Sequence, residues 1–95
     1  MASYKMYNDE MRDSSNRTIA KIYNNEVRDT SNKTIVKIVG DEIRDTNNNT
    51  IVKIVGEEVR DTSNRTLIKM PEIRKLIDNS MGGHSLVALW VAYIR

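Results

Sequence analysis

Residues 24–39 read Asn-Asn-Glu-Val-Arg-Asp-Thr-Ser-Asn-Lys-Thr-Ile-Val-Lys-Ile-Val, and this 16-residue unit occurs four times in the chain. A fixed repeat period decides the fold class, so it is the first property to establish. Six positions are identical in every copy, and in the second copy they hold Glu26, Arg28, Asp29, Asn32, Thr34 and Lys37. The four copies are Asn8–Tyr23, Asn24–Val39, Gly40–Val55 and Gly56–Pro71, and Ser3–Tyr7 matches the end of a further unit.

The unit is too short for two helices and two turns, and it suits two short strands joined by two turns. Thr34–Val39 is rich in β-branched residues, which is typical of strands. We therefore expect a mainly β fold, with four 16-residue β-hairpin repeats in residues 3–70. The repeats would form a pseudo-four-fold meander or a closed array.

The two turns of each unit differ in chemistry. Gly40-Asp41 and its equivalents predict a tight two-residue hairpin loop, because Gly supplies a positive φ freely and Asn tolerates it. The other turn begins at Asp29, whose carboxylate is suited to bind backbone amides two residues on. We prefer a four-residue loop with Asp29 opposite Thr34 and no bulge. The alternative is a three-residue loop that needs a bulge.

Parity along the strands predicts which side chains face the core. With the four-residue loop, Val27 lies opposite Val36, and Val27, Val36 and Ile38 share the inner face. The opposite face is mixed in character and carries Glu26, Arg28, Ile35, Lys37 and Val39.

The expected number of strands is odd, and this raises the question of whether the first and last strands pair to close the array. We expect a first strand within Ser3–Tyr7 and a ninth near Thr66–Met70, and pairing of the two would close the array and remove its exposed edges. An open stack, or closure through a second subunit, is the alternative.

The repeat pattern ends at Met70-Pro71, and the residues that follow favour helix. Pro71–Met81 has a helical stripe of apolar residues and Pro in its first turn. After Gly82-Gly83, Ser85 is placed to cap a second helix over Leu86–Ile94, which is apolar on every side and must be buried. A tenth strand is the alternative for this segment. We expect residues 71–95 to pack in the middle of the β array or on one end of it, so that residues 1–95 form a single domain.

The repeats and the C-terminal segment together resemble a known family. The form Glu-Ile-Arg-Asp-x-x-Asn-x-Thr-Ile-x-Lys-Ile at 42–54, with Gly-Gly-x-Ser-Leu-x-Ala-Leu-Trp at 82–90, resembles the small bacterial four-fold β-flower proteins. The resemblance implies β-hairpins in a pseudo-four-fold array. It implies no catalytic or binding residue.

Composition narrows the classes of function. The chain has 95 residues, a formal net charge of +2, no Cys and one His, so we expect no disulfide, metal site or cofactor. Nucleic-acid binding is not expected, because the charge is near balance and the units do not each carry an aromatic residue. The N-terminus lacks a signal-peptide pattern, which predicts a cytoplasmic protein.

Two sets of residues are candidates for function, and no catalytic set is found. The first set could line a pocket that binds an anionic ligand, and it consists of Arg12, Arg28, Arg44 and Arg60. The simpler interpretation is that each Arg pairs with a nearby Glu across the strands. The second is an apolar interaction segment for a protein partner, for a second copy of the chain or for a membrane surface; it is Leu86, Leu89, Trp90 and Ile94. The leading hypothesis is a non-enzymatic structural or protein-interaction module.

Overall fold

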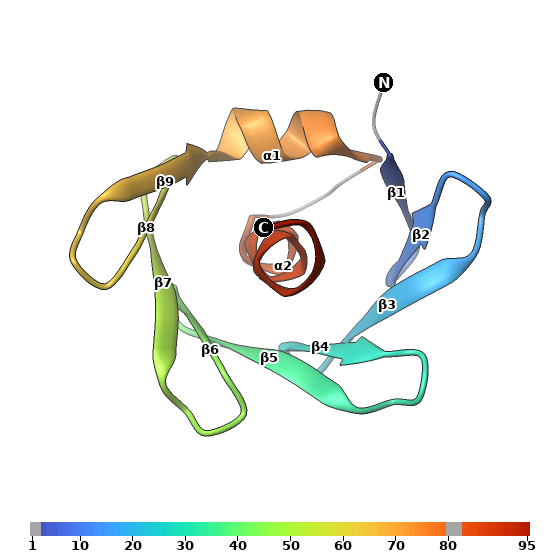
Figure 1. The fold of residues 1–95 in the computed structure, drawn as a ribbon, viewed down its shortest axis with the longest axis horizontal. Helices are drawn as coiled ribbons and strands as arrows, with labels where there is room; N and C mark the ends of the chain where they lie inside the picture. Colours follow the sequence, from blue (N-terminus) through green and yellow to red (C-terminus); the bar gives the residue numbers. More distant parts are fainter. Residues whose placement is uncertain (1–2, 80–82) are drawn as a thin grey trace.

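Ten strands of one sheet surround a central helix (Figure 1). The computed structural model describes residues 3–79 and 83–95. The strands follow the chain in the order β10-β1-β2-β3-β4-β5-β6-β7-β8-β9. The elements are β1 (Tyr4–Tyr7), β2 (Glu10–Asp13), β3 (Thr18–Tyr23), β4 (Glu26–Asp29), β5 (Thr34–Val39), β6 (Glu42–Arg44), β7 (Thr50–Val55), β8 (Glu58–Arg60), β9 (Thr66–Lys69), α1 (Met70–Leu76), β10 (Ile77–Asp78), α2 (His84–Leu89) and the π-helix η1 (Trp90–Ile94).

The tight turns follow the prediction. Ile38 lies opposite Ile43 across the turn at Gly40-Asp41. The first residue of each tight turn has a positive φ, which a Gly or Asn accommodates without the cost that other residues incur. These φ values are 58° at Asn8, 48° at Asn24, 60° at Gly40 and 61° at Gly56.

The second turn of each unit, here called the wide turn, departs from the prediction. Val27 lies opposite Val36, as expected. Thr34, however, lies opposite Arg28 and not opposite Asp29, because the register shifts between Val27 and Arg28. The predicted bulge-free loop is therefore wrong, and the same shift occurs in all four units.

Asp29 stabilises this bulged turn. Its backbone N–H donates to the carbonyl of Lys33 at 2.9 Å, and its Oδ1 accepts the backbone N–H groups of Ser31 and Lys33, both at 2.9 Å. Asn32 takes the left-handed conformation with φ 66°. The extra residue left between the two pairings is Ile35, whose side chain packs against the core.

The inner face of the sheet is apolar, as parity predicted. Val27 and Val36 are buried, and Ile38 is partly buried against the core. The equivalent positions in the other units are also apolar and form one continuous cluster. Its strand members include Met11, Ala20, Ile43, Val52, Ile54 and Val59.

Helix α1 is shorter than predicted. It begins at Met70 with Pro71 in its first turn, as expected, but it ends at Leu76. The next two residues, Ile77 and Asp78, form the short strand β10, which pairs in parallel with Tyr4 and Lys5 of β1. The rest of the predicted helix, Ser80 and Met81, lies outside the described residues.

The predicted second helix is confirmed, although its start differs. Helical structure runs through α2 and η1, from His84 to Ile94. Ser85 lies inside the first turn and provides no cap, because Gly83 is the N-cap residue. In the described part of the chain no helix is long and apolar enough to cross a membrane. The segment fills the middle of the array (Figure 1).

The predicted closure is wrong. The first strand pairs with β10 and not with β9, so the sheet is open and β9 is one of its edges. Helix α1 spans the interval between β9 and β1 (Figure 1). The four hairpins that contain the wide turns, here called petals, are β2–β3, β4–β5, β6–β7 and β8–β9. Together with α1 they make five units around α2.

Candidate functional site

The four predicted arginines lie on the outer face of the sheet, one in each petal. Arg28 and Glu26 flank the buried Val27 on β4, and strand alternation therefore directs both of them away from the core. Each arginine forms an ion pair with the Glu two residues before it. The N–O distances are 3.2 Å for Arg12–Glu10, 3.1 Å for Arg28–Glu26, 2.9 Å for Arg44–Glu42 and 2.8 Å for Arg60–Glu58.

Each pair belongs to a larger hydrogen-bonded network. In the second unit, Glu26 Oε1 accepts bonds from Arg28 Nε at 3.1 Å and from Thr34 Oγ1 at 2.8 Å. Arg28 also donates from Nη1 to Asn32 Oδ1 at 3.3 Å. The bond from Thr34, followed by that from Arg28, holds the pKa of Glu26 below its ordinary value. Four of the six invariant positions are thus used to join the two strands of a petal.

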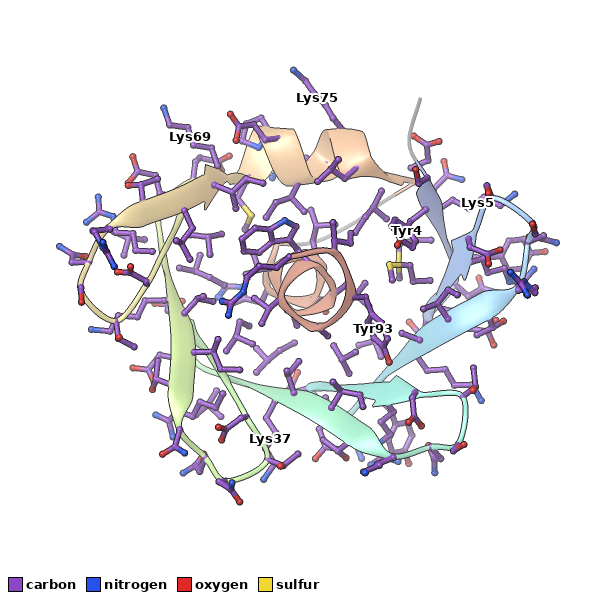
Figure 2. The ribbon with its side chains drawn as sticks, in the orientation of Figure 1. Tyr4, Lys5, Lys37, Lys69, Lys75 and Tyr93 are labelled. Atoms are coloured by element: carbon purple, nitrogen blue, oxygen red, sulfur yellow. The ribbon has the colours of Figure 1, made fainter. Side chains whose placement is uncertain are left out.

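Each ion pair joins an Arg and a Glu of the same strand, so the expected pairing of Arg with Glu across the strands is wrong. The arginines also do not form a common pocket for an anion. The side chains of Lys5, Lys37 and Lys69 point away from α2 (Figure 2). Arg12 and Arg44 share this outward direction, because they lie directly opposite Lys5 and Lys37. The guanidinium groups therefore face outward on separate petals and do not converge.

Two tyrosines distinguish the first two petals from the others. The guanidinium carbon of Arg12 lies 4.3 Å from the centre of the Tyr7 ring, and that of Arg28 lies 4.5 Å from the centre of the Tyr23 ring. Both tyrosines are 55% exposed. The same position holds Val39 and Val55 in the next two units. Aligning the repeats reveals this difference, but the Tyr–Arg stacking was not predicted.

A cavity of about 400 Å³ lies beside this stack. Its lining residues are Asp9, Glu10, Lys21, Ile22, Tyr23, Arg28 and Asn32. Glu10 is already bonded by Thr18 and Arg12. The cavity therefore offers two cations, one aromatic ring and one carboxylate, that of Asp9, outside the Glu–Arg network.

A larger hollow of about 700 Å³ lies nearer the tight turns and α2. Its lining is Met6, Asn8, Asp9, Ile22, Asn79 and Ser85. Asp9 is the one ionisable side chain among these six, so they provide no acid–base pair. Within residues 3–79 and 83–95, no group of three or more His, Asp or Glu side chains is placed to hold a metal ion.

The predicted interaction segment lies in the core. Leu86, Leu89 and Trp90 are buried, and Ile94 is partly buried against the same cluster. These four side chains pack against the inner face of the sheet and are not presented to a partner or a membrane surface. His84, at the start of α2, lies at the surface with Nε2 2.9 Å from Asp41 Oδ1.

One buried side-chain oxygen has no hydrogen-bond partner in the described part of the chain. It is the hydroxyl of Tyr93, which lies in the interior beside α2 (Figure 2). Burial, with a smaller contribution from the charge of Asp29, raises the pKa of Tyr93. The phenol is therefore held in its neutral form.

Comparison with known proteins supports this architecture. A family model described as 5-fold beta-flower protein matches residues 2–85. The predicted resemblance to β-flower proteins is thus confirmed, but the predicted four-fold form is wrong. The difference is consistent with α1, which adds a fifth unit to the four petals. No curated protein and no solved structure matches the chain.

Proposed function

This chain belongs to the 5-fold β-flower family, and on that premise we propose that it is a non-enzymatic protein-interaction module. One observation carries the proposal. The middle of the array is filled by α2 and η1, while the Glu–Arg pairs and the rings of Tyr7 and Tyr23 lie on the outer face. A surface that repeats the same polar pattern on a rigid support suits binding to another macromolecule better than it suits chemistry on a small substrate.

The roles of the acidic side chains support a module without catalysis. Asp13, Asp45 and Asp61 accept backbone amides in the wide turns, and these bonds lower the pKa of each carboxyl. The glutamates of the petals are each bonded by a Thr and an Arg. Carboxylates held in this way are ionised and occupied, which makes them poor general acids or bases at neutral pH.

Photo-crosslinking tests the proposal. A benzoylphenylalanine placed at Tyr23 or Val55 reports on the outer face, and one placed at Ser31 or Ser63 in the wide turns serves as the control. We expect a discrete adduct in cells from the outer-face positions, whose partner then forms the same complex when both proteins are purified. The absence of an adduct from both outer-face positions would contradict the proposal.

A second candidate function is the binding of a small anion in the 400 Å³ cavity. The observation that favours it is that Lys21 and Arg28 line this cavity together. Titration with inorganic phosphate tests it: Arg28→Ala should abolish saturable binding, and Arg44→Ala, at the equivalent position of the next petal, should leave it unchanged. Equal binding by the wild type and Arg28→Ala would exclude the site.

A further inference from the structure

The outer face of β1–β4 carries a repeated set of cationic and aromatic side chains. Strand alternation places these residues opposite the inward-facing Met6, Met11, Ala20 and Val27. We call the set the Tyr–Arg–Lys patch. Its members are Lys5, Tyr7 and Arg12 in the first half, and Lys21, Tyr23 and Arg28 in the second.

Like charges face each other across the strands of this patch. Lys5 lies directly opposite Arg12, and Lys21 lies directly opposite Arg28. Such pairs are unfavourable in an isolated sheet. Within the described residues neither lysine forms an ion pair, whereas each arginine has its Glu. The carboxylates of Glu10 and Glu26 are occupied, while Asp9 and Asp78 lie at the borders of the patch. An incoming carboxylate at either Lys–Arg pair would interact favourably with both members.

The tyrosines fix the arginines in place. Each guanidinium is held by its Glu, by an Asn of the wide turn and by the face of a Tyr ring. A side chain that is ordered before binding loses less entropy when a partner binds. Arg and Tyr are also the residue types that contribute most to protein interfaces. The half-exposed ring of Tyr23 provides an apolar contact next to the charges.

The pattern of charge favours a peptide over a nucleic acid. Glu10 and Glu26 alternate with the cations across the face, since Glu10 lies opposite Lys21. A phosphodiester chain carries a charge at every link and would bring phosphates against these carboxylates. One face of each Tyr ring is also covered by Arg, which leaves less ring surface for base stacking. An acidic peptide can place uncharged residues where the glutamates lie.

We propose that the Tyr–Arg–Lys patch binds an acidic segment of a partner protein. Carboxylates of the segment would lie at the Lys5–Arg12 and Lys21–Arg28 pairs, and an apolar side chain would pack against the exposed part of the Tyr23 ring. The proposal rests on the proposed function and names the chemistry of its partner.

The chain contains its own control for the experiment. The third and fourth petals keep the Glu and Arg of the patch, but Val39 and Val55 precede them at the positions that Tyr7 and Tyr23 hold before the first two petals. Tyr7→Val/Tyr23→Val therefore introduces a residue that this position accepts elsewhere in the same fold. The lysine variants Lys5→Glu/Lys21→Glu and Lys37→Glu/Lys53→Glu change the net charge equally, and they differ in the strands they alter, β1 and β3 in the first and β5 and β7 in the second.

The probe is a fluorescein-labelled copolymer of Glu and Tyr, followed by fluorescence anisotropy at several salt concentrations. We expect Tyr7→Val/Tyr23→Val and Lys5→Glu/Lys21→Glu each to weaken binding at least tenfold, and Lys37→Glu/Lys53→Glu to weaken it less than threefold. Val39→Tyr/Val55→Tyr should increase the amount of probe bound at saturation. Circular dichroism of each variant verifies the fold.

Two results would overturn the proposal. One is an equal loss of affinity in both lysine variants, which would mean diffuse attraction by net charge. The other is tighter binding of a 20-nucleotide oligothymidine with the same dependence on Tyr7 and Tyr23, which would make the patch a nucleic-acid surface. Crosslinks from Val55 but none from Tyr23 would leave the module proposal standing and exclude this patch, whereas a lack of crosslinks from both would count against the two together.

Discussion

Thr34 Oγ1 donates a 2.8 Å hydrogen bond to Glu26 Oε1, and so joins the two strands of a petal at the end where the wide turn begins. The same bond, at 2.8–3.0 Å, occurs in all four units. The bond favours an ionised Glu, because the same oxygen also accepts from the cationic Arg28 and the two bonds lower the pKa of the carboxyl. The stability of the fold should therefore depend on pH in a defined range.

We expect the midpoint of thermal unfolding to stay constant from neutral pH down to about pH 5 and to fall below it. The pKa of Glu26 is lowered in the folded state by Thr34 first and Arg28 second, and those of Glu10 and Glu42 are lowered by their Thr and Arg in the same order. The pKa of Glu58 is lowered by Arg60 first and Thr66 second. A lowered pKa stabilises the folded state above the unfolded pKa, and that stabilisation disappears as the pH falls through the folded pKa. Calorimetry at half-unit steps of pH measures the midpoint of thermal unfolding. Thr34→Val should reduce the fall of this midpoint at acidic pH. A midpoint that holds constant to pH 3 would contradict this account.

Asn32→Ala should destabilise the protein by about 1 kcal/mol, because Ala is disfavoured at a positive φ. It also removes the acceptor for Arg28 Nη1. Asn32→Gly loses the same acceptor and keeps the backbone freedom, so it is the matched control and should cost less. Urea unfolding measures both. If Ala were tolerated as well as Gly, the left-handed conformation would not be what selects this residue.

Leu89→Ala should destabilise the protein by about 2–5 kcal/mol, since its side chain is 1% exposed within the core cluster. Leu76→Ala, at a position that is 37% exposed, should cost much less. Trp90 is the single Trp of the chain and lies in the same core, so its emission reports unfolding directly. The folded protein should emit at a short wavelength that shifts to the red on unfolding. Equal losses at the two positions would argue against a buried α2.

Tyr93→Phe should leave the stability unchanged or raise it by up to about 1 kcal/mol. It removes a buried hydroxyl that has no partner among the described residues, and the cost of burying such a group then disappears. Thermal unfolding of the two proteins side by side is sufficient. A clear loss of stability in Tyr93→Phe would indicate that the hydroxyl is bonded in solution.

Much of the sheet could be predicted because the same pattern of turn residues and alternating apolar residues occurs in all four units. The pairing of Ile38 with Ile43 follows from turn chemistry, and the burial of Val27 and Val36 follows from parity. The bulge at Ile35 could not be distinguished by parity, because Val27 and Val36 reach the inner face with or without it. The bulged turn is stabilised by hydrogen bonds within it, among them those that Asp29 Oδ1 accepts from the backbone of Ser31 and Lys33.

The C-terminal segment was harder to predict, because its structure depends on tertiary partners. The apolar stripe of residues 71–81 gives no information about contacts with β1. In the structure, however, Ile77 pairs with Tyr4 of β1, and α1 ends before it. Ser is a favoured residue at the N-cap of a helix, but Ser85 lies inside α2. At the candidate site, the repeat located the four arginines correctly, but Tyr7 and Tyr23 depart from the repeat and escaped a search for what the units share.

The helix in the middle also bears on how such a chain can change during evolution. A 16-residue unit is easily duplicated, and the open edge at β9 places no limit on strand number. A helix with its side chains, however, is only about 10–12 Å across. A fifth petal would widen the array beyond what Leu86, Leu89 and Trp90 can fill, leaving voids in the core. The diameter of the central helix, and not the sheet around it, therefore limits the number of repeats. A homologue that gains a repeat would need larger side chains in its C-terminal helix to fill the core.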